Sequence, residues 1–393
     1  MQANITWREL LIRLALIFIC LGLWYNKLNI VTFPLLGLAW LLDDGYNKFR
    51  QLIKEPLVQA ILVLCAVLVL GLLWSDHPDG GRHKWLKYFI LLNFIPFFSL
   101  LNKKRLPWAF AALLFGYFGV LCIGIYQWAV LGGQGVPLFK MTYLSFSAML
   151  GIGVIISFYF ACTSSSKKIS ILSWVLMLTL LFVQFNQNGR SLLLATLITL
   201  SLLILLLYWA ELRKFMIIFV SLTVVISVFA FSSNGLQDRL SRVKHDIEQL
   251  QQGDYSTSLG YRLAMWDVGL NGIATRPLFG HGTGMPESYF NETIKTYKGG
   301  VYKDLKKFQR TSHYHNDWIE MGMHLGLLGI LALTFLLWSW YQTFKVHHLR
   351  VLGIALVSYI FLAGLTDAFI IYSRIPMLLL VITAITISWQ EEN

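Results

Sequence analysis

Charged residues are scarce in this chain of 393 residues. Only 13% are Asp, Glu, Lys or Arg, whereas 56% are hydrophobic, and the mean hydropathy is +0.62. A soluble globular domain carries about 25% charged residues, so the deficit excludes that class. Apolar runs long enough to cross a bilayer, roughly 17–25 residues, recur along nearly the whole sequence. The composition therefore indicates an integral membrane protein.

Several chemical signatures are absent as well. Cys20, Cys65, Cys122 and Cys162 all fall within apolar runs, where we expect buried small side chains and neither disulfides nor a metal site. The chain has no GxxxxGK phosphate loop, no Cys/His ligand set for zinc, and no tightly spaced acidic pair on the outer side to hold Mg²⁺. It also lacks the basic patch with exposed aromatics that nucleic-acid binding needs.

The apolar runs do not alternate residue by residue, as the strands of a membrane β-barrel would, so we expect helices. The predicted fold is an all-α integral membrane protein with about twelve spans, at residues 9–25, 28–43, 57–74, 85–101, 107–131, 141–162, 169–186, 190–209, 215–232, 318–341, 350–371 and 374–389. With the N-terminus in the cytoplasm, Lys and Arg of the short connections are twice as frequent inside as outside. This bias places both termini in the cytoplasm and accounts for most of the net charge of +12.

One segment, residues 233–317, is long and polar enough for structure of its own, and the charge bias places it outside. Its expected elements are helices over Leu236–Gln252, Leu259–Ile273 and Glu287–Thr296, with a turn-rich connector over Arg276–Gly284. The chain therefore divides into nine spans over residues 1–232, this partly helical periplasmic loop, and three spans over 318–393. We expect the three parts to form one structural unit.

Two arginines are candidates for binding an anion. Arg190 opens the eighth expected span at its outer end, where its charge opposes the helix dipole unless an anion is bound there. The alternative is an interfacial arginine that extends toward the lipid headgroups. Arg262 lies one helical turn before Trp266, so Trp266 could rest at headgroup level while Arg262 reaches a phosphate. A solvated surface arginine is the alternative for Arg262.

Titratable side chains gather in Arg310–Gly329, where the external loop enters the tenth span. His315 and Asn316 immediately precede the span, so a neutral His315 imidazole at the membrane surface could accept a proton from a hydroxyl. A structural interfacial histidine is the alternative. We expect His313 to be an accessory or a solvated neighbour.

A carboxylate in the eleventh expected span is a further candidate. Asp367 lies in an apolar run, where a lone acid is usually functional or partnered. It could orient His315, or it could pair with Arg190 or Arg374. Its predicted role is a supporting one.

This pattern resembles the O-antigen ligase/polymerase superfamily. The resemblance rests on many spans, a single long external loop late in the chain, and three features in order: Arg190, the helix with Arg262 and Trp266, and the stretch His315–Trp318. Leu73–Pro78 after the third span is also similar to that family. In length and layout the chain is most similar to the lipopolysaccharide O-antigen ligases, and its expected fold is similar to GT-C-type lipid-dependent glycosyltransferases.

The resemblance implies transfer of O-antigen polysaccharide from undecaprenyl pyrophosphate to a sugar hydroxyl of lipid A–core. The site would face the periplasm from the bacterial inner membrane, with no cofactor, nucleotide, nucleic acid or required metal. His315 would be the general base, while Arg190 and Arg262 stabilise the diphosphate and direct attack inverts the anomeric carbon. Supporting residues with weaker signals are His313, Asp367, Arg276, His281 and Arg374.

Two other functions fit parts of the pattern. A polymerase of the same superfamily uses the same donor with a second lipid-linked glycan as acceptor, but its external residues are more often split between two sizeable loops. A transporter or flippase of a charged lipid would need ionisable residues near the bilayer midplane and repeated halves. The candidates here lie at the outer boundary, and the sequence has no internal repeat.

Overall fold

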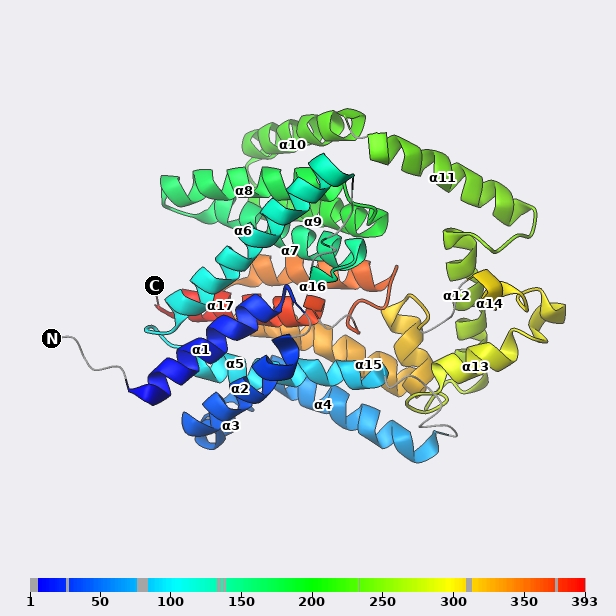
Figure 1. The fold of residues 1–393 in the computed structure, drawn as a ribbon, viewed down its shortest axis with the longest axis horizontal. Coiled ribbons are helices and arrows are strands. Elements are labelled where there is room, and N and C mark those ends of the chain that lie inside the picture. Colours follow the sequence, from blue (N-terminus) through cyan, green and yellow to red (C-terminus); the bar gives the residue numbers. More distant parts are fainter. Residues whose placement is uncertain are drawn as a thin grey trace.

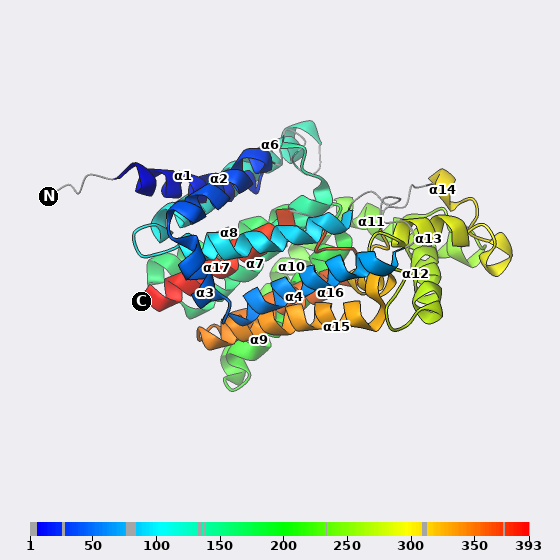
Figure 2. The same cartoon turned by 90° about the horizontal axis from the view of Figure 1, so that it is seen from below.

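The computed structural model describes residues 6–25, 28–75, 84–132, 136, 139–232, 234–308, 313–371 and 374–392. Its elements are α1 (Trp7–Gly22), α2 (Asn29–Leu42), α3 (Gly45–Leu52), α4 (Pro56–Leu70), η2 (Gly71–Trp74), η3 (Lys84–Asn93), α5 (Phe94–Leu100), α6 (Leu106–Leu131), α7 (Tyr143–Thr163), α8 (Lys167–Phe185), α9 (Arg190–Tyr208), α10 (Leu212–Ser232), α11 (Asn234–Gln251), α12 (Ser258–Thr275), α13 (Pro286–Thr293), η5 (Tyr297–Gly300), α14 (Leu305–Phe308), α15 (Asp317–Val346), α16 (Arg350–Gly364) and α17 (Arg374–Glu392). The longer helices run along the long axis of the molecule, and α12 to α14 form a group at one end (Figures 1 and 2).

The predicted all-α membrane fold is confirmed. Every expected span overlaps a helix among the described residues. By length and composition, the helices able to cross a membrane are Pro56–Trp74, Leu106–Leu131, Tyr143–Thr163, Lys167–Phe185, Arg190–Tyr208, Leu212–Phe231 and Asp317–Val346. Shorter apolar helices cover Ile30–Leu42, Trp85–Leu100 and Arg350–Gly364. The chain is therefore a multi-pass membrane protein.

The helix of the eleventh expected span, α16, ends before the predicted boundary at residue 371. α16 stops at Gly364, and the side-chain amide of Asn316 donates to the next carbonyl, that of Leu365, at 3.0 Å. The carboxylate of Asp317 also packs here, since a Cβ at Gly364 would lie 2.7 Å from its Oδ2. Asp367 thus lies on the non-helical segment between α16 and α17, and not within a helix as expected.

Helices α12–α14 have a hydrophobic core of their own. The main core joins the membrane helices, whereas a second cluster contains Tyr261, Ala264, Met265, Val268, Phe290, Ile294, Tyr302, Leu305, Tyr314, Ile319 and Met323. Most of these residues come from α12, α13 and the segment up to Tyr314, but Ile319 and Met323 belong to the first turns of α15. The second cluster is therefore completed by α15, a membrane-spanning helix.

α15 is interrupted in its N-terminal third. At Gly326 the backbone has φ 59° and ψ −141°, which is not helical. The connector between α12 and α13 fills this break, and a Cβ at Gly280 would lie only 2.5 Å from the backbone nitrogen of Gly326. The exchanged hydrogen bonds run from the N–H groups of Leu327 and Leu328 to the carbonyls of Pro277 and Leu278 (2.7 and 3.3 Å), and from His281 and Gly282 to those of Met323 and His324 (2.9 Å each). These bonds satisfy backbone groups that a helix break would otherwise leave unpaired.

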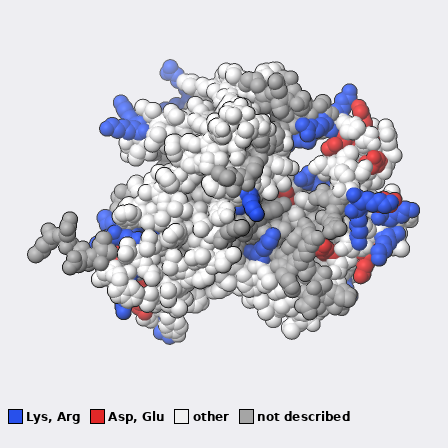
Figure 3. Space-filling model, viewed as in Figure 1, with Lys and Arg blue, Asp and Glu red and all other residues white. Residues whose placement is uncertain are grey.

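Helix α1 begins and helix α17 ends at the same end of the bundle, opposite to α12–α14 (Figures 1 and 2). Near them, Arg105 between α5 and α6 binds Glu9 and Asp43, each at 2.7 Å. Figure 3 shows Lys and Arg gathered toward both ends, with a broad, mostly uncharged surface over the helices between them. Such a band is what a membrane-embedded surface requires.

Candidate active site

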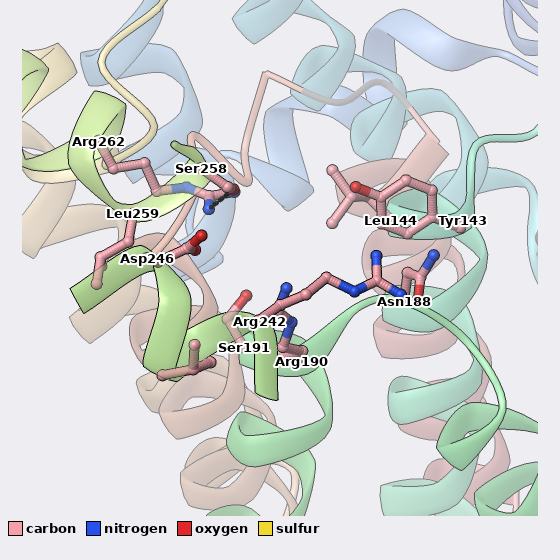
Figure 4. Close-up of a pocket in the computed structure, with 11 residues that line it drawn as sticks. Tyr143, Leu144, Asn188, Arg190, Ser191, Arg242, Asp246, Ser258, Leu259 and Arg262 are labelled. Carbon is pink, nitrogen blue, oxygen red and sulfur yellow. Dashed lines mark hydrogen bonds between the residues drawn. The ribbon is translucent and has the colours of Figure 1, made fainter. Parts of the chain in front are cut away.

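Arg190 and Arg262 line one pocket, although they belong to helices far apart in the sequence. The pocket has a volume of about 400 Å³ and lies between the N-terminal ends of α7 and α9 on one side and helices α11 and α12 on the other (Figure 4). Its lining residues are Tyr143, Leu144, Asn188, Arg190, Ser191, Arg242, Val243, Asp246, Ser258, Leu259 and Arg262. Guanidinium groups and a helix N-terminus are the groups that bind phosphate oxygens in proteins.

Arg190 is the first residue of α9, as predicted. The preceding Gly189 is the N-cap and packs against α7, because a Cβ there would lie 2.6 Å from Ser147 Oγ. The tight turn is closed by a hydrogen bond from the N–H of Arg190 to the carbonyl of Asn188 at 3.0 Å. The lack of a side chain at Gly189 therefore lets the start of α9 sit directly at the pocket.

Arg262 projects from the first turns of α12, and its Nη1 donates to Ser258 Oγ at 3.1 Å. One turn later Trp266 is fixed by contacts within the protein. Its indole Nε1 donates to the carbonyl of Tyr314 at 3.1 Å, and its ring packs against the second hydrophobic cluster. The Arg-x-x-x-Trp helix thus connects the pocket to the segment that carries the two histidines.

Asp367 holds both histidines. Its Oδ1 lies 2.9 Å from His315 Nδ1 and 3.2 Å from His313 Nε2, and the two imidazole rings are 4.1 Å apart between centroids. The same oxygen also accepts from the N–H of Ala368 at 2.9 Å. Of the three partners considered for Asp367, the structure places His315 beside it, together with His313.

The local backbone explains how His315 reaches this position. Asn316 is the N-cap of α15, and its Oδ1 accepts from the N–H groups of Trp318 and Ile319 at 2.9 and 3.1 Å. His315 itself has φ 48°, in the left-handed region that residues other than glycine seldom adopt. The chain therefore turns sharply just before the helix and directs the imidazole toward Asp367.

The electrostatics favour a neutral His315. Burial lowers its pKa below the ordinary value of 6.5, the charges of His313 and Arg262 lower it further, and Asp367 opposes the shift. Burial would raise the pKa of Asp367, but hydrogen bonds from His313 and His315 hold it well below its usual range. Asp367 is thus an ionised carboxylate that accepts a hydrogen bond from the protonated Nδ1 of His315. In this tautomer Nε2 of His315 is free of a proton and can accept one.

The same three side chains could also hold a metal ion. His313, His315 and Asp367 each offer a ligand atom, and these atoms lie within 4.8 Å of one another. The sequence showed no Cys/His ligand set because Asp367 follows His315 by 52 positions. Two histidines and one acid are a common zinc set. Here, however, His315 Nδ1 and His313 Nε2 each already lie at hydrogen-bonding distance from Asp367 Oδ1.

The other predicted supporting residues lie apart from this cluster. Arg276 is the exposed C-cap of α12. His281 is buried in the connector, where its Nε2 lies 2.8 Å from the carbonyl of Gly272. Arg374 begins α17, is buried, and donates to the carbonyl of Phe139 at 3.1 Å. None of the three lines the pocket of Figure 4.

Two pocket residues were not anticipated. Arg242 and Asp246 lie one turn apart on α11 and both line the pocket. The sequence indicated only the apolar stripe of this helix, so its polar face was indistinguishable from a solvated one.

Comparison with known proteins agrees with this geometry. Residues 175–334, which include Arg190, Arg262 and His315, match the family model described as O-antigen ligase. The chain is 28% identical over 173 residues to an uncharacterized protein of Haemophilus influenzae, covering 40% of this chain and 42% of the relative. It is 27% identical over 161 residues to the O-antigen ligase of Escherichia coli, covering 40% of this chain and 37% of the relative. The chain thus matches less than half the length of these curated relatives, and together the matches support the predicted resemblance to the O-antigen ligase/polymerase superfamily.

Proposed function

We propose that this protein is an O-antigen ligase, which transfers O-antigen polysaccharide from undecaprenyl pyrophosphate to a sugar hydroxyl of lipid A–core. The observation that carries the proposal is the pocket shared by Arg190 and Arg262, with the His315–Asp367 pair on the segment that Trp266 ties to the same helix. The family match over residues 175–334 and the printed name of the Escherichia coli relative favour this class.

In this proposal the arginines hold the diphosphate of the donor. Each guanidinium can bind two phosphate oxygens and remains charged at any physiological pH. As the glycosidic bond to the diphosphate breaks, negative charge grows on the leaving oxygen, so donors fixed beforehand stabilise the transition state more than the ground state. The residues required are already opposite each other across the pocket.

His315 acts as the general base. The acceptor hydroxyl oxygen attacks the anomeric carbon, its proton passes to Nε2 of His315, and the bond from that carbon to the diphosphate oxygen breaks with its electron pair leaving on the diphosphate. The resulting imidazolium is stabilised by Asp367, whose Oδ1 lies 2.9 Å from Nδ1. Because the attack is direct and opposite to the leaving group, the anomeric configuration inverts. No step requires a metal or a nucleotide.

The site faces the periplasm from the inner membrane, with both termini in the cytoplasm. Support comes from the chain ends, which lie at the end of the bundle away from α12–α14 (Figure 1), and from the charge bias of the short connections. The donor and acceptor are both lipid-anchored, so each can approach the pocket from the outer leaflet. The membrane helices would accommodate their lipid tails.

The test is an in vitro transfer assay with purified protein, undecaprenyl-pyrophosphate-linked glycan and rough lipopolysaccharide, in EDTA and without ATP. We expect a shift of lipopolysaccharide to higher mass on a gel, and no shift with His315→Ala despite normal membrane insertion. Longer glycans on the lipid carrier instead would make the protein a polymerase. Wild-type transfer by His315→Ala would reject the proposed base, and transfer lost in EDTA but restored by Zn²⁺ would assign the His/His/Asp cluster to a metal.

A further inference from the structure

The proposed anion pocket contains an acid. Asp246 lines it together with Arg190, Arg242 and Arg262, so the pocket has three guanidinium groups and one carboxylate, a formal charge of +2. Figure 4 shows Arg190 and Arg242 between Asn188 on one side and Asp246 with Arg262 on the other. A carboxylate in a site for a diphosphate weakens ground-state binding. Its presence therefore needs a reason other than affinity.

The charges of donor and product supply that reason. The diphosphate of a lipid-linked glycan is esterified at both ends and carries one ionised oxygen on each phosphorus. After transfer the terminal phosphate is freed, and its second ionisation, with a pKa of about 6, adds most of another negative charge at pH 7. The formal pocket charge of +2 balances the two negative charges of the donor diphosphate. The product diphosphate carries more negative charge than the pocket balances, by the amount that the reaction creates.

We propose that Asp246 promotes release of the polyprenyl diphosphate product, an inference that rests on the proposed function. While donor is bound, three arginines and one carboxylate balance its charge. Bond cleavage leaves the additional negative charge on the freed terminal phosphate, and the proton of the acceptor goes to His315. The carboxylate of Asp246 then repels the product more than it repelled the donor.

The position of Asp246 on α11 suits this role. It lies four residues after Arg242, hence on the same face of the helix, so one helix presents both an attractive and a repulsive charge to the ligand. Glu248 lies two residues further, is exposed, and pairs with Lys244 at 3.9 Å outside the pocket lining. The same helix therefore offers a matched acid that does not face the ligand.

The decisive experiment compares two probes on the purified full-length protein. One is undecaprenyl pyrophosphate, and the other is undecaprenyl pyrophosphate esterified with a single N-acetylglucosamine. For Asp246→Asn we expect the affinity for free undecaprenyl pyrophosphate to rise about tenfold more than the affinity for the ester. The free pyrophosphate carries about one more negative charge than the ester, and repulsion of one unit charge across the pocket amounts to about a tenfold change in binding. Asp246→Glu, which keeps the charge, should keep the wild-type ratio of the two affinities, and Glu248→Gln should behave as wild type.

Transfer kinetics give an independent readout. In rapid-quench experiments Asp246→Asn should keep the rate of the first turnover and lose rate in later turnovers, with stronger inhibition by added undecaprenyl pyrophosphate. An equal gain of affinity for both probes, or a gain of the same size in Glu248→Gln, would overturn the proposal. The binding comparison needs no acceptor or transfer, so it stands apart from a failure of the ligase assignment.

Discussion

The interaction between Asp367 and His315 permits a quantitative prediction. In Asp367→Asn the amide oxygen can still accept a hydrogen bond from Nδ1 of His315, but the negative charge is lost. During transfer His315 becomes an imidazolium, and the two opposite charges would lie about 4 Å apart between their centres. With an effective dielectric constant of about 20 this attraction amounts to about 4 kcal/mol. That free energy corresponds to a rate factor of about 10³.

We therefore expect kcat/KM for glycan transfer to fall by about 10³ in Asp367→Asn, within a range of about 10²–10⁴. The measurement is the initial rate of lipopolysaccharide modification at saturating acceptor, with a thermal melt to verify folding. In a His315→Ala background the same substitution should cost little further activity, because the two residues act as a unit. A folded Asp367→Asn protein within fivefold of wild type would refute the role of the carboxylate.

Three further outcomes follow. Arg190→Lys should lower kcat/KM at least about tenfold, because an ammonium lacks the two-pronged geometry of a guanidinium, while Arg213→Lys at the exposed start of α10 should have no effect in the same assay. Since burial lowers the pKa of His315 below 6.5, the midpoint of the acid-side decline of kcat/KM should lie below pH 6.5. A decline centred above pH 7 would contradict this. Gly280→Ala should lower the melting temperature in detergent, because the φ of Gly280 is +64° and the new Cβ would lie 2.5 Å from the α15 backbone. Gly299→Ala is the control, since Gly299 has φ +70° but open space around it. The smaller loss expected in Gly299→Ala measures the cost of the dihedral alone.

Helical periodicity and turn chemistry predicted most of the architecture. The helix expected over Leu236–Gln252 is α11, and that over Leu259–Ile273 is α12. Glu320 and His324, four residues apart on α15, lie 3.5 Å from each other. Local patterns suffice in these cases because the interacting atoms belong to one helix or one turn.

The site itself depends on contacts between distant segments, which no local pattern specifies. Arg190, Arg262 and His315 could be named one by one, but not their arrangement. The convergence of His313 and His315 on Asp367 depends on where α16 ends, and that end is set by Asn316 and Asp317 from another helix. The roles of these residues in transfer stay predictions until the assays are done.

The break in α15 also bears on the order in which the protein is made. The connector after α12 and the core around Tyr261 emerge from the ribosome first, but their partners Ile319, Met323 and Leu327 come later in the chain. The segment from α12 to α14 therefore cannot complete its core until α15 has been synthesised. We expect a nascent chain stopped before Asp317 to be protease-sensitive outside the membrane, and to become resistant once the next span is synthesised.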